Sequence, residues 1–249
     1  MATIVLIHGA WTGGWLWGRV APDLRARGHT VHTPTLTGLG ERDHLLGPDI
    51  DLELHAADVL NLLEYEDVQR ALLVGHGYGG AVAQRVAAIA PERIGRLLLL
   101  DALLARPGAS LLETLGTAAE LLQTRAYDDA GLAVYAPDTG LLLDSLIKRD
   151  ADWVEDRLVP MPVAPYHQAL DLAEFFALDR PIVVVRPTNG DPAATVADAL
   201  AEEYGFPHHE IDGGHLLMIA KPDATAELID NFARQPAARF VKQDGGFPR

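Results

Sequence analysis

The chain has 249 residues, with 35 acidic and 20 basic side chains that give a formal charge of −15. This negative charge opposes binding to nucleic acid or to an anionic membrane surface, so we expect neither partner. The absence of cysteine excludes disulfides, thiolate metal sites and a cysteine nucleophile. No apolar run reaches the length of a membrane span, about 20 residues, and the first run lacks the basic start of a signal peptide. We therefore expect a cytoplasmic protein. We expect it to be a monomer or a homodimer.

Short apolar runs alternate with segments of helical periodicity along most of the chain. We predict strands at residues 3–8, 29–35, 71–75, 96–101, 181–186 and 207–211. We predict helices at residues 17–27, 52–64, 79–89, 192–204 and 222–232. The strands have continuous apolar cores, such as Ile-Val-Leu-Ile at 4–7, which is typical of parallel strands buried on both faces. This alternation predicts an α/β fold, with helices on both faces of a mostly parallel, twisted sheet.

The alternation stops between residues 106 and 178, a loop-rich stretch with helical segments and few strand signals. We predict a helical lid, or cap, at 106–178 that interrupts a core formed by residues 1–105 and 179–249. Insertions at the carboxyl edge of an α/β sheet often cover a binding site. Five aromatic residues are candidates for binding an apolar substrate: Trp11, Trp153, Tyr166, Phe175 and Phe176. The polar stretch after Phe232 is predicted to be a surface extension.

A glycine-rich turn at residues 75–80, Gly-His-Gly-Tyr-Gly-Gly, joins the third predicted strand to the next helix. Three of its glycines match the G-x-G-x-x-G pattern of dinucleotide-binding proteins, and Asp101 ends the following strand where a ribose-binding acid is expected. That pattern should follow the first strand, however, and the bulky side chains at 76 and 78 would obstruct a pyrophosphate. NAD binding is therefore a remote alternative, and we expect no cofactor.

The same turn also fits the G-x-S-x-G motif of a nucleophile elbow, a strained strand-to-helix turn, with Gly77 in the place of the serine. Further motifs are Ile-His-Gly-Ala-Trp at 7–11, Pro-Thr-Leu-Thr-Gly-Leu-Gly-Glu-Arg at 34–42, Leu-Asp-Ala at 100–102, Asp-Trp-Val at 152–154, Leu-Val-Pro at 158–160 and Gly-Gly-His at 213–215. Together these motifs, between residues 3 and 232, resemble the α/β-hydrolase family, in particular its small esterases, plant hydroxynitrile lyases and methyl-salicylate-type esterases.

The resemblance implies an α/β-hydrolase fold and a set of site residues. The amides of Ala10 and Tyr78 would form an oxyanion hole. His215 would be the general base, and Asp191 would orient it and stabilise its charged form. Gly77 would occupy the nucleophile position without a side chain. The chain order of elbow, acid and histidine is that of the family.

The two candidate acids each have a simpler structural interpretation. Asp191 precedes Pro192 and could cap the helix that begins there, a role that is compatible with catalysis. Asp101 is the alternative acid, because it follows another predicted strand, but we interpret it as a turn residue. His208 and His209 alternate along a predicted strand and lack further ligand-like partners, so we expect no metal site.

Without a hydroxyl at position 77, this sequence cannot form the acyl-enzyme of a serine esterase. We predict an enzyme that acts on a small hydrophobic metabolite with a carbonyl or ester group, through the histidine–aspartate pair and the oxyanion hole. Its reaction would be water-activated hydrolysis or that of a lyase, isomerase or cyclase. Two alternatives remain open: a serine esterase whose nucleophile was replaced by Gly77, and a non-catalytic protein that binds small molecules.

Overall fold

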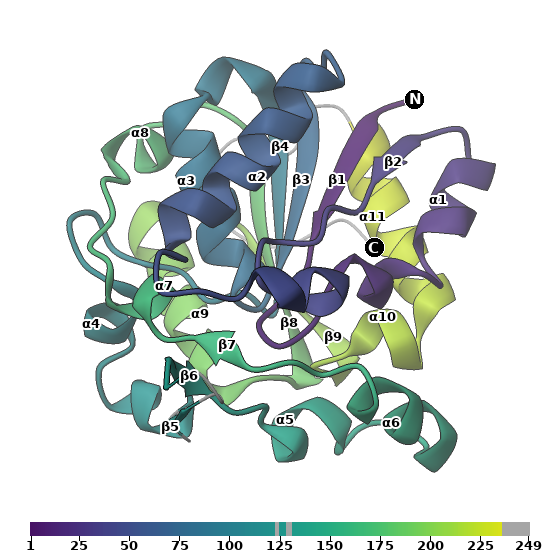
Figure 1. Ribbon diagram of the computed structural model, residues 1–249. Helices are drawn as coiled ribbons and strands as arrows, with labels where there is room; N and C mark the ends of the chain where they lie inside the picture. Colours follow the sequence, from purple (N-terminus) through teal and green to yellow (C-terminus); the bar gives the residue numbers. More distant parts are fainter. Residues whose placement is uncertain (123–124, 128–130, 236–249) are drawn as a thin grey trace.

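The structure, a computed structural model, describes residues 1–122, 125–127 and 131–235, so the predicted surface extension lies mostly outside the described residues. Its main feature is a six-stranded parallel sheet in the order β2-β1-β3-β4-β8-β9 (Figure 1). The strands are β1 (Thr3–Ile7), β2 (Thr30–His32), β3 (Ala71–His76), β4 (Ile94–Leu100), β8 (Ile182–Asn189) and β9 (His208–Gly214). All six correspond to strands predicted from the sequence, although β2 is shorter than expected.

Strands β1, β3 and β4 form the buried centre of this sheet. Every residue of β3 is buried, and so are the last four residues of β1 and of β4. The apolar runs seen in the sequence therefore mark strands covered on both faces, as expected for a parallel sheet. Because the strands all point the same way, the residues that follow them meet at one edge of the sheet.

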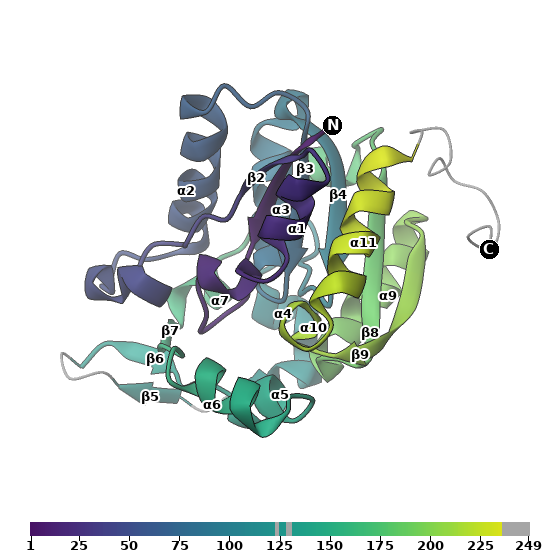
Figure 2. The ribbon, with the colours of Figure 1, turned by 90° about the vertical axis from the view of Figure 1, so that its right-hand side faces the viewer.

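Helices cover both faces of the sheet, as predicted (Figure 2). Helices α1 (Ala21–Ala26) and α11 (Pro222–Arg234) pack together on one face. Helices α2 (Leu52–Tyr65) and α3 (Gly79–Ile89) pack together on the other, and α9 (Thr195–Tyr204) lies beside β8 and β9. The short helices of the core are η1 (Gly14–Trp17), η2 (Gly40–Leu45), η3 (Pro91–Arg93), η5 (Pro192–Ala194) and α10 (Leu217–Ala220). Among the described residues, none of the helices combines the length and the apolar character needed to cross a membrane.

Helix α2 illustrates why these segments are helical. Asp51 caps its first turn by accepting a hydrogen bond from the Leu54 amide, at 2.8 Å. Leu52, Val59 and Leu63 recur at helical spacing and are buried against the core. Capping satisfies one of the amides that the first turn leaves free, and the apolar face supplies most of the stability.

Most of the insertion, residues 106–178, lies across the carboxyl ends of the parallel strands, and its last helix packs beside α3 (Figures 1 and 2). Its elements are α4 (Leu111–Leu115), η4 (Gly116–Leu122), β5 (Arg125–Tyr127), β6 (Ala133–Tyr135), α5 (Thr139–Leu143), α6 (Lys148–Glu155), β7 (Met161–Pro162), α7 (Ala164–His167) and α8 (Ala173–Phe176). The sequence predicts a helical insertion with few strand signals, but the insertion also contains an antiparallel sheet formed by β5, β6 and β7. These strands are only two or three residues long, too short to show a strand period in the sequence.

Helix α6 of the insertion is fastened to the core by an ion pair. The terminal nitrogens of Arg19 donate to the Asp150 carboxylate at 2.9 and 2.8 Å, and these bonds lower the pKa of Asp150 to about 2. Beside this pair, Trp153 packs edge-on against Trp15, with ring centroids 5.2 Å apart. We call Arg19, Asp150, Trp15 and Trp153 the latch. It joins residues more than 130 positions apart, so no local pattern predicts it.

Candidate active site

The turn between β3 and α3 needs three of its glycines for packing. An added Cβ would lie 2.6 Å from the Gly79 carbonyl oxygen at Gly75, 2.5 Å from the His8 carbonyl oxygen at Gly79, and 2.5 Å from the Ala102 Cβ at Gly80. No side chain fits at such distances without moving the backbone. The close approach of strand, helix and neighbouring loops therefore explains the Gly-x-x-x-Gly-Gly pattern.

Gly77 differs from these three glycines because its position has room for a side chain. A Cβ there would lie 3.5 Å from Gly9 Cα and from His215 Cε1, and 3.7 Å from His215 Nε2, all ordinary contact distances. The backbone has φ +53°, in the left-handed region where other residues are strained. A side chain at position 77 would thus point at the histidine, as a nucleophile in an elbow does.

His215 is held on its other side by Asp101. Its Nδ1 donates to the Asp101 carboxylate at 2.7 Å, and both side chains are buried. The same carboxylate oxygen accepts a hydrogen bond from the Asp191 amide, also at 2.7 Å. At Gly190 a Cβ would lie 2.5 Å from the Asp101 carboxylate, so a glycine is needed beside it. With the proton on Nδ1, His215 presents an unprotonated Nε2 to position 77.

The prediction that Asp191 orients His215 is therefore wrong. The Asp191 side chain accepts a hydrogen bond from the Ala193 amide at 2.8 Å, so it caps η5 as its simpler interpretation proposed. Asp101, interpreted from the sequence as a turn residue, has the contact instead. It follows β4, the direct neighbour of the strand that carries the elbow, whereas Asp191 follows β8, one strand further out.

The same contact argues against the NAD alternative. The Asp101 carboxylate is buried and bound to His215, so it is not available to a ribose. The bulky residues His76 and Tyr78 are also fully buried in the turn, where a pyrophosphate would have to approach. Among the described residues, no group of three or more acidic or histidine side chains is arranged to hold a metal ion.

Opposing effects set the basicity of His215. Burial by itself lowers the pKa of His215, but the hydrogen bond and charge of Asp101, with the charges of Asp191 and Asp138, outweigh it and raise the pKa above its ordinary value. The neighbouring His76 has a pKa well below its ordinary value, because it is buried and lies beside His215. His215 is thus the base of this cluster, and His76 stays neutral.

Tyr78 is anchored by its hydroxyl, away from its amide. The hydroxyl donates to His55 Nδ1 at 2.9 Å, and His55 Nε2 donates to the Thr37 carbonyl oxygen at 2.9 Å. Burial is the main cause that lowers the pKa of His55, which keeps it neutral and able to accept. This chain of bonds fixes the residue that follows position 77.

The loop after β1 is held in a similar way by a neutral histidine. His8 Nε2 accepts a hydrogen bond from the Leu36 amide at 3.0 Å, and its Nδ1 donates to the Gly9 carbonyl oxygen at 2.8 Å. Burial lowers the pKa of His8 to about 4. In the part of the chain that the structure describes, neither the Ala10 amide nor the Tyr78 amide has a hydrogen-bond acceptor. Both amides are thus free to bind a ligand atom.

Two of the five predicted substrate-binding residues lie together beside the elbow. The Tyr166 ring packs against the Tyr78 ring, with centroids 5.4 Å apart, and edge-on against Tyr135 at 5.3 Å. The Trp11 indole nitrogen donates to the Tyr135 carbonyl oxygen at 2.9 Å. The hydroxyls of Tyr135 and Tyr166 are buried without a hydrogen-bond partner among the described residues. Tyr135 is not among the predicted site residues, because its short strand β6 has no recognisable pattern in the sequence.

The structure places the other three predicted substrate-binding residues elsewhere. Trp153 belongs to the latch, with the guanidinium of Arg157 4.4 Å from its ring centroid. Phe175 packs edge-on against Phe206, and Phe176 lies against Tyr204 at 4.0 Å, in an aromatic cluster where α8 packs on α3. The prediction that Phe175 and Phe176 bind the substrate is wrong, because their rings fill this cluster in the core.

Comparison with known proteins assigns the chain to a family. A model described as Alpha/beta hydrolase family matches residues 4–228. The chain belongs to the alpha/beta hydrolase family. It is 35% identical to the carbendazim hydrolyzing esterase of Nocardioides sp. (strain SG-4G), over 92% of this chain and 98% of that protein. The resemblance seen in the motifs is thereby confirmed at the level of the family.

Solved structures of other alpha/beta hydrolases agree with this assignment. An extracellular alpha/beta-hydrolase from a Paenibacillus species superposes with a TM-score of 0.79 and is 25% identical, covering 94% of this chain and all of that one. A pyrethroid hydrolase superposes with a TM-score of 0.75 and is 26% identical, covering 96% and 99% of the two chains. The predicted fold class is confirmed, and the chain is an esterase-like enzyme of this family.

Proposed function

We propose that this alpha/beta hydrolase hydrolyses small apolar esters with a water molecule as the nucleophile, without an acyl-enzyme. The proposal rests on one observation: His215 faces position 77, and the glycine at that position has no side chain. The unprotonated Nε2 faces the space that a side chain at position 77 would occupy, and Gly77 leaves this space unfilled. A water molecule in that space would lie within reach of the base.

The proposed reaction has two steps. His215 Nε2 takes a proton from the water, and the hydroxide adds to the ester carbonyl carbon. The amides of Ala10 and Tyr78 form the oxyanion hole that stabilises the negative oxygen. The bond to the alkoxy oxygen then breaks, and His215 returns the proton to the leaving alkoxide. Asp101 remains a carboxylate throughout, holding Nδ1–H and stabilising the imidazolium.

The surroundings of the elbow support a small, largely apolar substrate. Trp11, Tyr135 and Tyr166 bring aromatic surface to the elbow, and the insertion lies over this edge of the sheet. We propose that the insertion, residues 106–178, serves as a lid on a core of residues 1–105 and 179–249. The 35%-identical relative is named an esterase, which supports an ester as the substrate.

The test measures hydrolysis of 4-nitrophenyl acetate and methyl benzoate in water enriched in oxygen-18. We expect the acid product to contain one oxygen from the solvent. His215→Ala should lower kcat/KM by about 100-fold or more, the usual contribution of a general base. His44→Ala, at an exposed histidine of η2, is the matched control and should retain full activity. An unchanged rate in His215→Ala, or a product without solvent oxygen, would contradict the proposal.

The room at position 77 also supports a second candidate, a serine esterase whose nucleophile is replaced by glycine. In that case the chain itself would not turn over esters, while Gly77→Ser would gain an activity that fluorophosphonates block by covalent labelling. The Cβ of the new serine would meet only ordinary contacts. Turnover by the unchanged chain separates the two candidates, because only the water-based reaction predicts it.

A further inference from the structure

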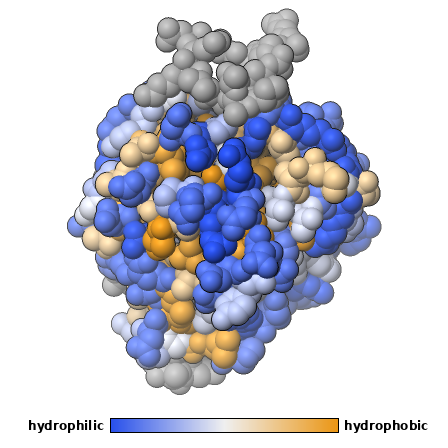
Figure 3. Space-filling view, turned by 90° about the horizontal axis from the view of Figure 1, so that it is seen from above, coloured by the Kyte–Doolittle hydropathy of each residue, from blue (hydrophilic) through white to orange (hydrophobic). Residues whose placement is uncertain are grey.

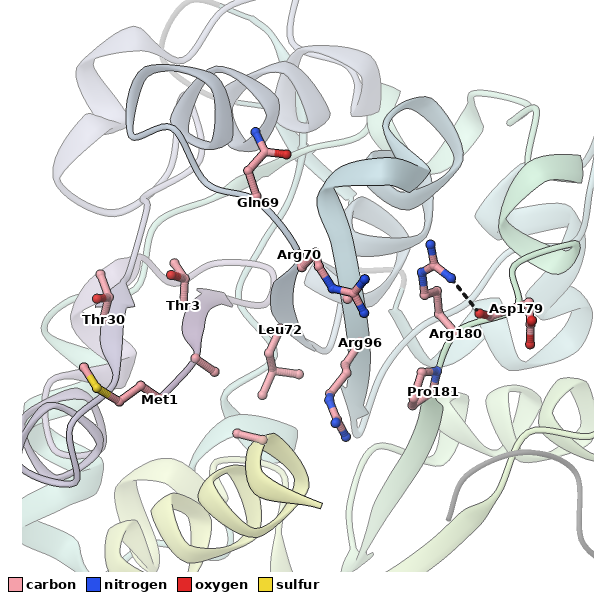
Figure 4. A pocket seen from close by; sticks show the side chains of 13 residues that line it. Met1, Thr3, Thr30, Gln69, Arg70, Leu72, Arg96, Asp179, Arg180 and Pro181 are labelled. Atoms are coloured by element: carbon pink, nitrogen blue, oxygen red, sulfur yellow. Dashed lines mark hydrogen bonds between the residues drawn. The ribbon is translucent and has the colours of Figure 1, made fainter. Parts of the chain in front are cut away.

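A second polar site lies at the opposite edge of the sheet, where strands begin. There a cavity of about 510 Å³ opens between the starts of β1, β3, β4 and β8 and the end of α11. Figure 4 shows Arg70, Arg96 and Arg180 around it, with Thr3 and Thr30 across from them. Figure 3 looks onto this edge and shows hydrophilic residues gathered over its middle.

The charge of this cavity is unlike that of the chain as a whole. Its described lining includes three arginines and one acidic residue, Asp179, although the chain carries 15 more acidic than basic side chains. Overall negative charge does not prevent a local positive site, since charges further apart than about 10 Å are largely screened at 0.1 M salt. The local balance of charge at this edge is therefore positive.

None of these arginines forms an ion pair with a carboxylate within the described ranges. Arg96 donates to the carbonyl oxygens of Phe232 and Gln235, and Arg180 donates to those of Ile94 and Asp179. Most arginines elsewhere, such as Arg19, Arg27 and Arg85, pair with carboxylates. The guanidinium charges in the cavity are therefore not neutralised by carboxylates, unlike those of most other arginines in the described residues.

Arg70 is also held in an unusual backbone conformation. Its φ is +57°, in the left-handed region that non-glycine residues rarely adopt. A Cβ at Gly95 would lie 2.6 Å from the Arg70 carbonyl oxygen, so the two backbones are in close contact. This contact fixes the start of β3 against β4 and places Arg70 next to the strand that carries Arg96. Burial, with a smaller contribution from the charge of Arg70, lowers the pKa of Arg96.

We infer that this cavity binds a small oxyanion with two or more negative charges, such as a phosphate group or a dicarboxylate. Guanidinium groups bind these anions through paired, charge-assisted hydrogen bonds. An anion between Arg70 and Arg180 would offset their positive charges, and Arg96 adds positive charge at the same edge of the sheet. The length of β3 places this site about 20 Å from position 77, so it is separate from the proposed ester site.

The test is calorimetric titration of the full chain with inorganic phosphate and with succinate, against chloride at matched ionic strength. We expect saturable binding of at least one dianion, with a Kd of about 1 mM or tighter. Binding of phosphate alone identifies a phosphate site, and binding of succinate alone or of both anions identifies a carboxylate or a general dianion site.

Three variants connect this binding to the cavity. Arg70→Gln and Arg180→Gln should each weaken binding about fivefold or more, by loss of a charge-assisted hydrogen bond. Arg25→Gln removes an arginine of α1 that also lacks an ion pair among the described residues and does not line the cavity; it should leave the Kd unchanged. Thermal melts confirm that each variant folds. No saturable binding of either dianion, or an equal loss in Arg25→Gln, would overturn the inference.

Discussion

The core contributes the catalytic groups of the proposed ester site, and the insertion contributes aromatic surface around it. Every group assigned to the reacting atoms comes from the core: His215, Asp101, and the amides of Ala10 and Tyr78. The insertion adds aromatic surface through Tyr135 and Tyr166, and it is fastened by the latch. We therefore expect changes in the core to alter the rate of the chemical step, and changes in the insertion to alter substrate binding.

The largest expected effect tests the core directly. Asp101→Asn should lower kcat/KM by roughly 10³-fold, because an asparagine amide can donate to Nδ1 and leave the proton on Nε2. Asp191→Asn is the matched control, since its side chain can still accept from the Ala193 amide and its backbone can still donate to residue 101. Steady-state kinetics should show less than a tenfold loss in this control. Equal losses in the two variants would contradict the assignment of Asp101.

A smaller effect is expected when the latch is broken. Asp150→Asn leaves Arg19 without its counter-charge and should lower the free energy of unfolding by about 1–2 kcal/mol. It should also raise KM several-fold with little change in kcat, because the insertion loses its attachment while the core is intact. Urea unfolding and steady-state kinetics measure the two effects. Asp152→Asn is the control, because it removes the same charge from the same helix but breaks only an exposed ion pair with Lys148. It should lower the free energy of unfolding by less than about 0.5 kcal/mol.

The smallest expected effect is a shift in the pH dependence. His215 acts as a base only when it is neutral, so kcat/KM should rise with pH through its pKa. Because Asp101, Asp191 and Asp138 raise that pKa, the midpoint should lie above the ordinary histidine value of 6.5. Asp191→Asn removes one of these negative charges and should move the midpoint to lower pH. A midpoint that stays in place or moves upward would contradict an effect of the Asp191 charge on His215.

The sequence predicted the core well and the insertion poorly, for physical reasons. The strands of the core are apolar runs flanked by turn residues, and position 77 and His215 belong to motifs that follow strands. Asp101 and Asp191 both follow strands as well, and the sequence does not tell which strand is the lateral neighbour of β3. In the insertion, Phe175 and Phe176 have the same apolar character whether they bind a substrate or pack against Phe206 and Tyr204.

The most direct test of the proposed reaction is the intact mass of the protein during turnover. The unchanged chain and Gly77→Ser are mixed with a 4-nitrophenyl ester, quenched within the first turnovers and weighed by mass spectrometry. We expect the unchanged chain to release product while its mass stays constant. Gly77→Ser should gain the mass of one acyl group, because its side chain fits beside His215. An acyl adduct on the unchanged chain, formed and lost at the rate of turnover, would contradict the proposed reaction.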